Sequence, residues 1–89
     1  MRELLVTTQF KKDLKKAKKR GKPGDKLQAI LETIVAGRPL ASKHRPHKLS
    51  GDWQPCWECH IETDWLLIWD EDETSVTLIR TGTHADLFD

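Results

Sequence analysis

The order in which hydrophobic patterns follow one another constrains the fold of this 89-residue chain more than any single motif. A short strand pattern comes first, two amphipathic helix patterns follow, and three strand patterns close the chain. The segments are a strand at 3–6, a helix from 7 or 8 to about 20, a helix between 25 and 37, and strands at 56–62, 65–69 and 75–80. The order β-α-α-β-β-β predicts one α+β domain over residues 1–89, with a helical hairpin packed on an antiparallel sheet.

Both helix predictions rest on apolar side chains that recur at helical spacing. These are Phe10, Leu14 and Ala17 in the first helix, and Leu27, Ile30, Leu31 and Ile34 in the second. Thr7 or Thr8 can cap the start of the first helix, and Asp25 can cap the second. Gly21 and Gly37 end the two helices, since glycine readily adopts the left-handed conformation found there.

Residues 38–54 are predicted to be a loop, because Pro39 and Pro46 interrupt them and no periodic pattern runs through them. A loop of this length is uncommon in a compact domain unless it has a function. It carries two histidines, His44 and His47, and Trp53. We therefore expect the loop to contribute side chains to a site.

Several function classes are excluded by composition. No stretch approaches the roughly 20 consecutive apolar residues of a membrane span. The amino terminus turns acidic at Glu3, too early for a signal peptide. Two cysteines are too few for a disulfide scaffold. The sequence therefore predicts a soluble cytoplasmic protein that does not bind membranes.

Charge is distributed unevenly along the chain, although the formal net charge is only +1. Residues 1–48 hold 14 of the 15 lysines and arginines and carry a net +10, whereas residues 49–89 carry a net −9. A basic region of that size can form a phosphate-binding face. The alternative is a lysine-rich helix that is simply solvated.

The segment 56–60 reads C-W-E-C-H and matches the C-x-x-C-H signature of haem attachment. Within a strand, however, side chains three positions apart point to opposite faces, so Cys56 and Cys59 cannot both reach one cofactor. The same parity disfavours a zinc site, although His44 and His47 could supply a second ligand pair. We interpret the motif as a chance match and expect neither a metal nor a cofactor.

Histidines and charged side chains recur around the three predicted strands. Strand parity places Trp57, Cys59 and Ile61 toward the helices and leaves His60 on the open face of the sheet. The others are His47, Asp64, Arg80 and His84. Convergence of three histidines, an aspartate and an arginine on one open face would be typical of a functional site rather than of ordinary surface.

The last ten residues combine an arginine, a histidine and a terminal aromatic. Arg80 can clamp phosphate oxygens, His84 can titrate near neutral pH, and Phe88 can stack on a base. These are the parts of a metal-free RNA-cleaving site. The alternative is that 81–83 is only a turn and Phe88 only anchors the terminus.

Three motifs together are specific: H-K-L-S-G-D-W at 47–53, His60 followed by Asp64-Trp65, and R-T-G-T-H-x-x-L-F at 80–88. With them the chain resembles, over essentially its whole length, the YafQ branch of the RelE/ParE toxin superfamily. The resemblance implies a RelE-like fold and a toxin of a type II toxin–antitoxin pair. It also implies a ribosome-dependent endoribonuclease, an mRNA interferase that cuts mRNA in the ribosomal A site.

The resemblance marks a set of site residues. The catalytic set is His47, His60, Asp64, Arg80 and His84, and the substrate-binding set is Trp65, Phe88, Lys11, Lys15 and Lys18. Metal-free cleavage through the 2′-OH needs a base, an acid and a cation on the phosphorane. His60 and His84 are candidates for the acid–base pair, in either order, and Asp64 for orienting one of them.

The remaining residues would bind the substrate. Arg80 would hold the scissile phosphate bidentately, His47 would contact the phosphate or share in proton transfer, and Phe88 would stack on a codon base. Trp65 would lie beside the site. Three lysines of the first helix would grip ribosomal RNA phosphates. The alternative for each lysine is a solubilising role.

The partners implied by the resemblance are a cognate antitoxin protein, the ribosome and mRNA, with operator DNA bound only by the toxin–antitoxin complex. Two other functions remain open. One is a ParE-like toxin of the same fold that acts by binding a target rather than by cutting RNA. The other is a catalytically silent partner in a regulatory complex.

Overall fold

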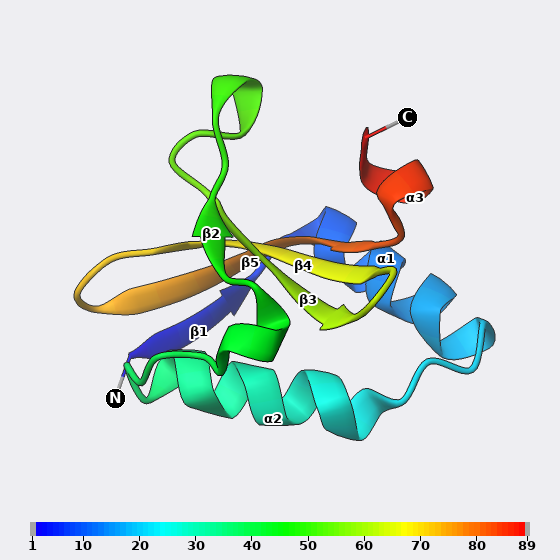
Figure 1. Cartoon of the computed structure of the whole chain (residues 1–89), viewed down its shortest axis with the longest axis horizontal. Helices are drawn as coiled ribbons and strands as arrows, with labels where there is room; N and C mark the ends of the chain where they lie inside the picture. The colour runs from blue at the N-terminus through cyan, green and yellow to red at the C-terminus, as the bar shows by residue number, and fades with distance from the viewer. Residues whose placement is uncertain (1, 89) are drawn as a thin grey trace.

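A computed structural model of the chain describes residues 2–88 (Figure 1). Its helices are α1 (Thr8–Lys19), α2 (Gly24–Val35) and α3 (His84–Phe88), and its strands are β1 (Glu3–Val6), β2 (His47–Lys48), β3 (Trp57–Glu62), β4 (Trp65–Glu71) and β5 (Ser75–Gly82). The predicted α+β succession is therefore confirmed, with β2 and α3 as additions. Among residues 2–88, no helix is long and apolar enough to cross a membrane.

The two long helices form where their caps and periodicity place them, with one correction. The Thr7 hydroxyl caps α1 by accepting a hydrogen bond from the Phe10 amide at 3.0 Å. Gly21 and Gly37 follow the helices with φ angles of 77° and 75°, the left-handed conformation that glycine adopts without strain. Asp25 does not cap α2, because that helix begins one residue earlier and Asp25 lies within its first turn.

The five strands form one sheet in the order β1-β5-β4-β3-β2. The strands β3, β4 and β5 make the predicted antiparallel meander. The edge strand β1 instead pairs parallel with β5, so the sheet is mostly rather than wholly antiparallel. Residues 38–54, predicted as a loop, contain two short 3-10 helices (Ser42–His44 and Gly51–Trp53) and β2, which pairs with β3.

Both long helices cover the same face of the sheet (Figure 1). The buried side chains of this core are Phe10, Ala17, Leu27, Ile30, Ile34, Cys59, Ile61, Trp65, Leu67, Trp69, Val76 and Leu78. The rings of Trp57 and Trp69 stack at its margin with centroids 6.2 Å apart. Burying each large apolar side chain stabilises the fold by about 1.5–3 kcal/mol, so this face holds the helices in place.

The sequence predicted that the opposite face of the sheet is open, and this prediction is wrong because the face is partly covered. The central strand β4 is apolar on both sides, and its Leu66 and Ile68 are fully buried in a second, smaller cluster. Leu87 of α3 covers them, with Trp53 and Leu49 from the loop packed alongside. In Figure 1 the later part of this loop, with the 3-10 helix Gly51–Trp53, and α3 rise from the side of the sheet opposite α2, whereas the 3-10 helix Ser42–His44 lies next to α2. Packing on β4 therefore places α3 and the loop beside the polar residues of this face.

Candidate active site

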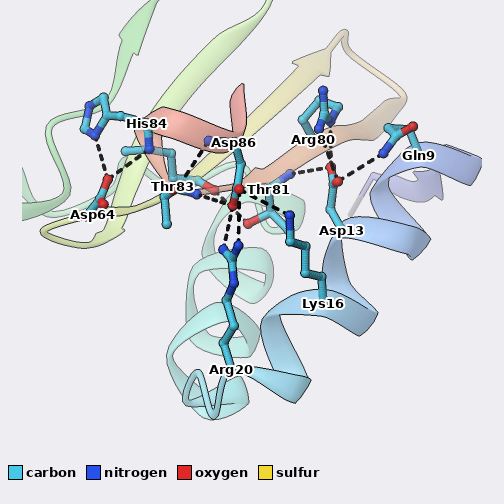
Figure 2. Close-up of polar contacts among 11 residues, drawn as sticks. Gln9, Asp13, Lys16, Arg20, Asp64, Arg80, Thr81, Thr83, His84 and Asp86 are labelled. Carbon is cyan, nitrogen blue, oxygen red and sulfur yellow. Dashed lines mark hydrogen bonds and ion pairs between the residues drawn. The ribbon is translucent and has the colours of Figure 1, made fainter. Parts of the chain in front are cut away.

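Two histidines and an aspartate from separate parts of the chain meet beside the β3–β4 hairpin. His60 lies on β3, Asp64 lies in the hairpin turn, and His84 is the first residue of α3. The ring centroids of His60 and His84 are 5.7 Å apart. Nδ1 of His84 lies 2.8 Å from Oδ1 of Asp64 (Figure 2). Three of the five predicted catalytic residues are thus brought together.

Asp64 fixes His84 through two hydrogen bonds to one oxygen. The backbone N–H of His84 donates to Oδ1 at 2.9 Å, and the ring Nδ1 lies 2.8 Å from the same atom. The pKa of Asp64 is lowered, first by the backbone hydrogen bond and then by the ring hydrogen bond. The charged carboxylate therefore holds the proton of neutral His84 on Nδ1 and leaves Nε2 available. Both side chains are more than half exposed, which leaves room for a ligand.

His60 is held in the same way by a backbone oxygen. Its Nδ1 lies 3.2 Å from the carbonyl oxygen of Thr63, so that nitrogen donates and Nε2 is available. The carbonyl of His60 in turn accepts from Nδ1 of His44 at 2.8 Å. His44 was considered in the sequence only as a possible zinc ligand, and in the structure it supports the strand that carries His60.

His47 contacts a different acidic residue. Its Nδ1 donates to the carbonyl of Arg45 at 2.8 Å, and its Nε2 lies 3.3 Å from Oε1 of Glu58. Glu58 is buried, with 5% of its surface exposed. Its Oε2 has no hydrogen-bond partner within residues 2–88. Glu58 stands two residues before His60, so the alternation of side chains along β3 puts both on the same face, and this was the signal that could have added Glu58 to the candidate site.

Phe88 lies next to His84. The two ring centroids are 6.4 Å apart, and the edge of the Trp53 ring packs against Phe88 with centroids 5.9 Å apart. Phe88 nevertheless remains 43% exposed. An aromatic side chain held by neighbours and open to solvent on one side is suited to stacking on a base.

Arg80 forms an ion pair with Asp13 of α1, a residue that no sequence motif connects with it. Its Nε donates to Oδ2 of Asp13 at 2.7 Å and its Nη2 to Oδ1 at 3.2 Å (Figure 2). The amide of Thr81 donates to the same carboxylate at 3.2 Å. Burial raises the pKa of Asp13, but the hydrogen bonds led by Arg80 outweigh it and the pKa is lowered. Arg80 is therefore held against α1, and within residues 2–88 its Nη1 makes no hydrogen bond.

The expected substrate contact of Trp65 is corrected by its position. Its side chain is 1% exposed and belongs to the core under the helices. Residues 65–69 form an unbroken apolar run, in which the alternation that would have assigned Trp65 to a face is missing. Trp65 therefore supports the hairpin carrying Asp64 rather than contacting a ligand.

The cations of α1 divide between two flanks, because an α-helix has about 3.6 residues per turn. One flank faces Arg80 across a polar groove of about 210 Å³, lined among others by Lys12, Lys16 and Arg20. The predicted RNA contacts, Lys11, Lys15 and Lys18, are exposed on the other flank. The structure thus places these three lysines away from the site, and the groove residues were not distinguished from them in the sequence.

The two cysteines of the C-x-x-C-H motif lie on opposite faces of the sheet, as strand parity predicted. Cys59 is fully buried in the core under the helices, whereas Cys56 packs against the cluster on the other face. Within residues 2–88, no three His, Cys, Asp or Glu side chains are grouped as metal ligands would be.

Comparison with known proteins identifies the class to which this fold and site belong. The family model for YafQ, the bacterial toxin of type II toxin–antitoxin systems, matches residues 2–89. The chain therefore belongs to the YafQ family of bacterial toxins, and the resemblance seen in its motifs is confirmed.

Individual relatives agree over the whole length. The mRNA interferase toxin YafQ of Escherichia coli (strain K12) is 35% identical over 88 residues, which cover 98% of this chain and 96% of that protein. The crystal structure of the E. coli DinJ–YafQ toxin–antitoxin complex contains a chain that matches with a TM-score of 0.92 and 35% identity, covering 99% of this chain and 98% of that one. YafQ from E. coli strain BL21(DE3) matches with a TM-score of 0.95 and 33% identity over the full length of both chains.

Proposed function

We propose that this chain is a ribosome-dependent mRNA endoribonuclease, the toxin of a type II toxin–antitoxin system, with residues 1–89 as its single domain. The observation that carries the proposal is the pairing of His60 and His84, whose rings lie 5.7 Å apart with Asp64 bonded to one of them. The E. coli relative is named an mRNA interferase, which is the same class of reaction. A toxin that only binds its target would not need this acid–base arrangement.

The reaction is a transesterification at a phosphodiester bond. One histidine accepts the proton of the 2′-OH through Nε2, the 2′-oxygen attacks phosphorus, and the bond to the 5′-oxygen breaks. The other histidine, as imidazolium, gives its proton to the departing 5′-oxygen. The products are a 2′,3′-cyclic phosphate and a 5′-hydroxyl. Asp64 stabilises the charged form of His84 and keeps its Nδ1 protonated, and the roles of base and acid can be assigned in either order.

The phosphate is bound by a cation that is already ordered. Arg80 keeps Nε and Nη2 on Asp13 and presents Nη1 to a phosphate oxygen, where it stabilises charge in the transition state. His47, fixed by the hydrogen bond from its Nδ1 to the Arg45 carbonyl, contacts the phosphate or shares in proton transfer. Phe88 stacks on a base of the codon. None of these steps requires a metal or another cofactor.

The remaining partners follow from the family. We propose that a cognate antitoxin neutralises this chain, as in the E. coli DinJ–YafQ toxin–antitoxin complex, and that operator DNA is bound only by the two proteins together. Because translating ribosomes and mRNA are found in the cytoplasm, we propose that the protein acts there. The exposed flank of α1 contributes Lys11, Lys15 and Lys18 to contacts with ribosomal RNA phosphates.

The direct test is 5′-end mapping of a defined mRNA in a purified translation system. Wild-type protein is compared with His84→Ala and with Arg38→Ala, an exposed control position. We expect codon-phased cuts that require ribosomes, persist in the control and weaken about 10²–10⁴-fold in His84→Ala, the usual contribution of an acid–base group. Intact mRNA with wild-type protein would reject the nuclease and favour a toxin that acts by binding.

A further inference from the structure

The helix α3 carries both His84 and Phe88 but has only five residues. A helix this short is not stable in water on its own, because too few hydrogen bonds offset the cost of nucleating it. Leu87 is buried and anchors one side. The orientation of the two site residues therefore depends on what holds the other side.

Asp86 closes the first turn of α3 on itself. Its Oδ2 accepts a hydrogen bond from the amide of Thr83 at 3.0 Å, and the hydroxyl of Thr83 accepts one from the amide of Asp86 at 3.1 Å. This reciprocal pair is a capping box, which satisfies amide groups that the helix itself cannot. Because His84 follows Thr83 directly, the Asp86 carboxylate is thereby fixed relative to the backbone of His84.

The same carboxylate reaches α1. Arg20 donates to both Asp86 oxygens, from Nη1 to Oδ2 at 2.6 Å and from Nη2 to Oδ1 at 3.3 Å, and Nζ of Lys16 lies 3.3 Å from Oδ1 (Figure 2). The Asp86 side chain is only 17% exposed. Its pKa lies well below the ordinary value, first because Arg20 donates to it and then because the Thr83 amide does. It is therefore charged at neutral pH.

Close packing leaves Asp86 little freedom. A Cβ atom on Gly82, at the end of β5, would lie 2.9 Å from both Cβ and Oδ2 of Asp86. Real Cβ atoms do not approach so closely, so the absence of a side chain at Gly82 lets Asp86 lie against the strand. One carboxylate thus joins α3 to the end of β5 and to α1.

We propose that Asp86 is a positioning residue for the RNA cleavage proposed above. By joining the capped turn of α3 to Arg20, the residue that follows α1, it sets His84 against Asp64 and holds Phe88 beside the site. The inference rests on the proposed function, since His84 and Phe88 matter for that reaction.

Replacing Asp86 is expected to have two opposite effects on activity, one through KM and one through kcat. Replacing Asp86 removes a negative charge and frees Arg20 and Lys16, which strengthens binding of an RNA substrate and lowers KM. It also loosens α3, which lowers kcat by about 10- to 100-fold, since a displacement of about 1 Å at a catalytic group has a cost of that order. A carboxylate that merely repelled RNA would raise activity when removed.

The experiment measures kcat for cleavage of a ribosome-bound mRNA at one defined codon, and it compares four variants with the wild type. Asp86→Asn keeps an acceptor for Thr83 but loses the charge that Arg20 binds, and Asp86→Ala loses both. Asp86→Glu keeps the charge and the residue type preferred in capping boxes. Asp25→Asn makes the same charge change at an exposed position in α2. We expect kcat to fall in Asp86→Asn, to fall further in Asp86→Ala, to fall least in Asp86→Glu, whose added methylene must fit against Gly82, and to be retained in Asp25→Asn.

A second readout does not depend on cleavage. The amide of Leu87 donates to the carbonyl of Thr83 at 3.1 Å inside α3, and its hydrogen exchange can be followed by NMR beside that of Leu67 in β4. We expect Asp86→Asn to speed exchange at Leu87 and leave Leu67 unchanged, whether or not the wild type cuts mRNA. Unchanged exchange at Leu87, an unchanged kcat beside an active wild type, or equal loss of protection at Leu67 would overturn the positioning role.

Discussion

At the scale of single residues, the two hydrogen bonds between His84 and Asp64 are the contact on which the chemistry most depends. In Asp64→Asn the amide oxygen can still accept from His84 Nδ1 but carries no charge to stabilise the imidazolium. We expect cleavage to slow, by less than the roughly 10²–10⁴-fold of removing an acid–base group altogether. Single-turnover cleavage of a ribosome-bound mRNA measures this, and a rate equal to wild type would remove Asp64 from the mechanism.

Asp13 is the residue whose charge ties Arg80 to the fold. Its lowered pKa means that the stabilisation is complete above the ordinary value of 3.8 and is lost as the pH falls through the lower, folded value. We expect Asp13→Asn to destabilise the protein by about 1.5–3 kcal/mol at pH 7, the range for hydrogen bonds to charged groups.

Urea unfolding at pH 7 and through the acid range measures both effects of Asp13→Asn. The wild type should lose stability on acidification more steeply than the variant, because only the wild type has this carboxylate to protonate. Parallel pH profiles would show that the Asp13 charge is not what holds Arg80.

At the scale of elements, the alternation of side chains along β3 and the residue before it places Cys56 and Cys59 on opposite faces of the sheet. Burial, and then the charge of Glu58, raise the pKa of Cys59 to about 12, and its side chain is fully buried. Cys56 is half-buried, with a pKa raised by burial and then by Asp70. We expect a thiol reagent at pH 8 to label Cys56 first and Cys59 only when the protein is unfolded. Two thiols that react together in the native protein would contradict this.

The junction between β5 and α3 can be tested by adding one methyl group. In Gly82→Ala the new Cβ would press on Asp86, so we expect α3 to shift and mRNA cleavage to fall while the rest of the fold persists. Gly24→Ala is the matched control, since nothing lies within 4 Å of its added Cβ and alanine favours a helix. Equal cleavage by the two variants would show that the contact between Gly82 and Asp86 does not matter.

Most of the elements could be predicted from periodicity and caps, and the missed ones have identifiable causes. The sequence T-H-A-D at 83–86 is a capping-box pattern that would have predicted the start of α3. The pairing of Asp13 with Arg80 joins residues 67 positions apart, and no local pattern encodes such a contact. Trp65 was misplaced because a central strand that is apolar on both faces shows no alternation.

At the scale of the whole molecule, the basic residues of α1 have different surroundings on its two flanks. On the flank facing Arg80, Lys16 and Arg20 pair with Asp86, whereas within residues 2–88 Lys15 and Lys18 on the other flank make no ion pair. The flank that carries Lys15 and Lys18 is therefore the one free to bind an extended array of phosphates. We expect Lys15→Glu/Lys18→Glu to weaken binding to ribosomes.

Salt dependence distinguishes the removal of phosphate-binding cations from general repulsion. If Lys15 and Lys18 each bind a phosphate, the slope of log affinity against log salt becomes shallower by about 0.7–0.9 for each lysine replaced. The double variant Arg38→Glu/Lys43→Glu makes the same charge change at exposed positions away from α1 and should keep the wild-type slope. Equal slopes in both variants would mean that the flank of α1 does not dock. If the slope changes only in Lys15→Glu/Lys18→Glu, ribosome binding is assigned to α1. Catalysis then remains assigned to α3 and the β3–β4 hairpin.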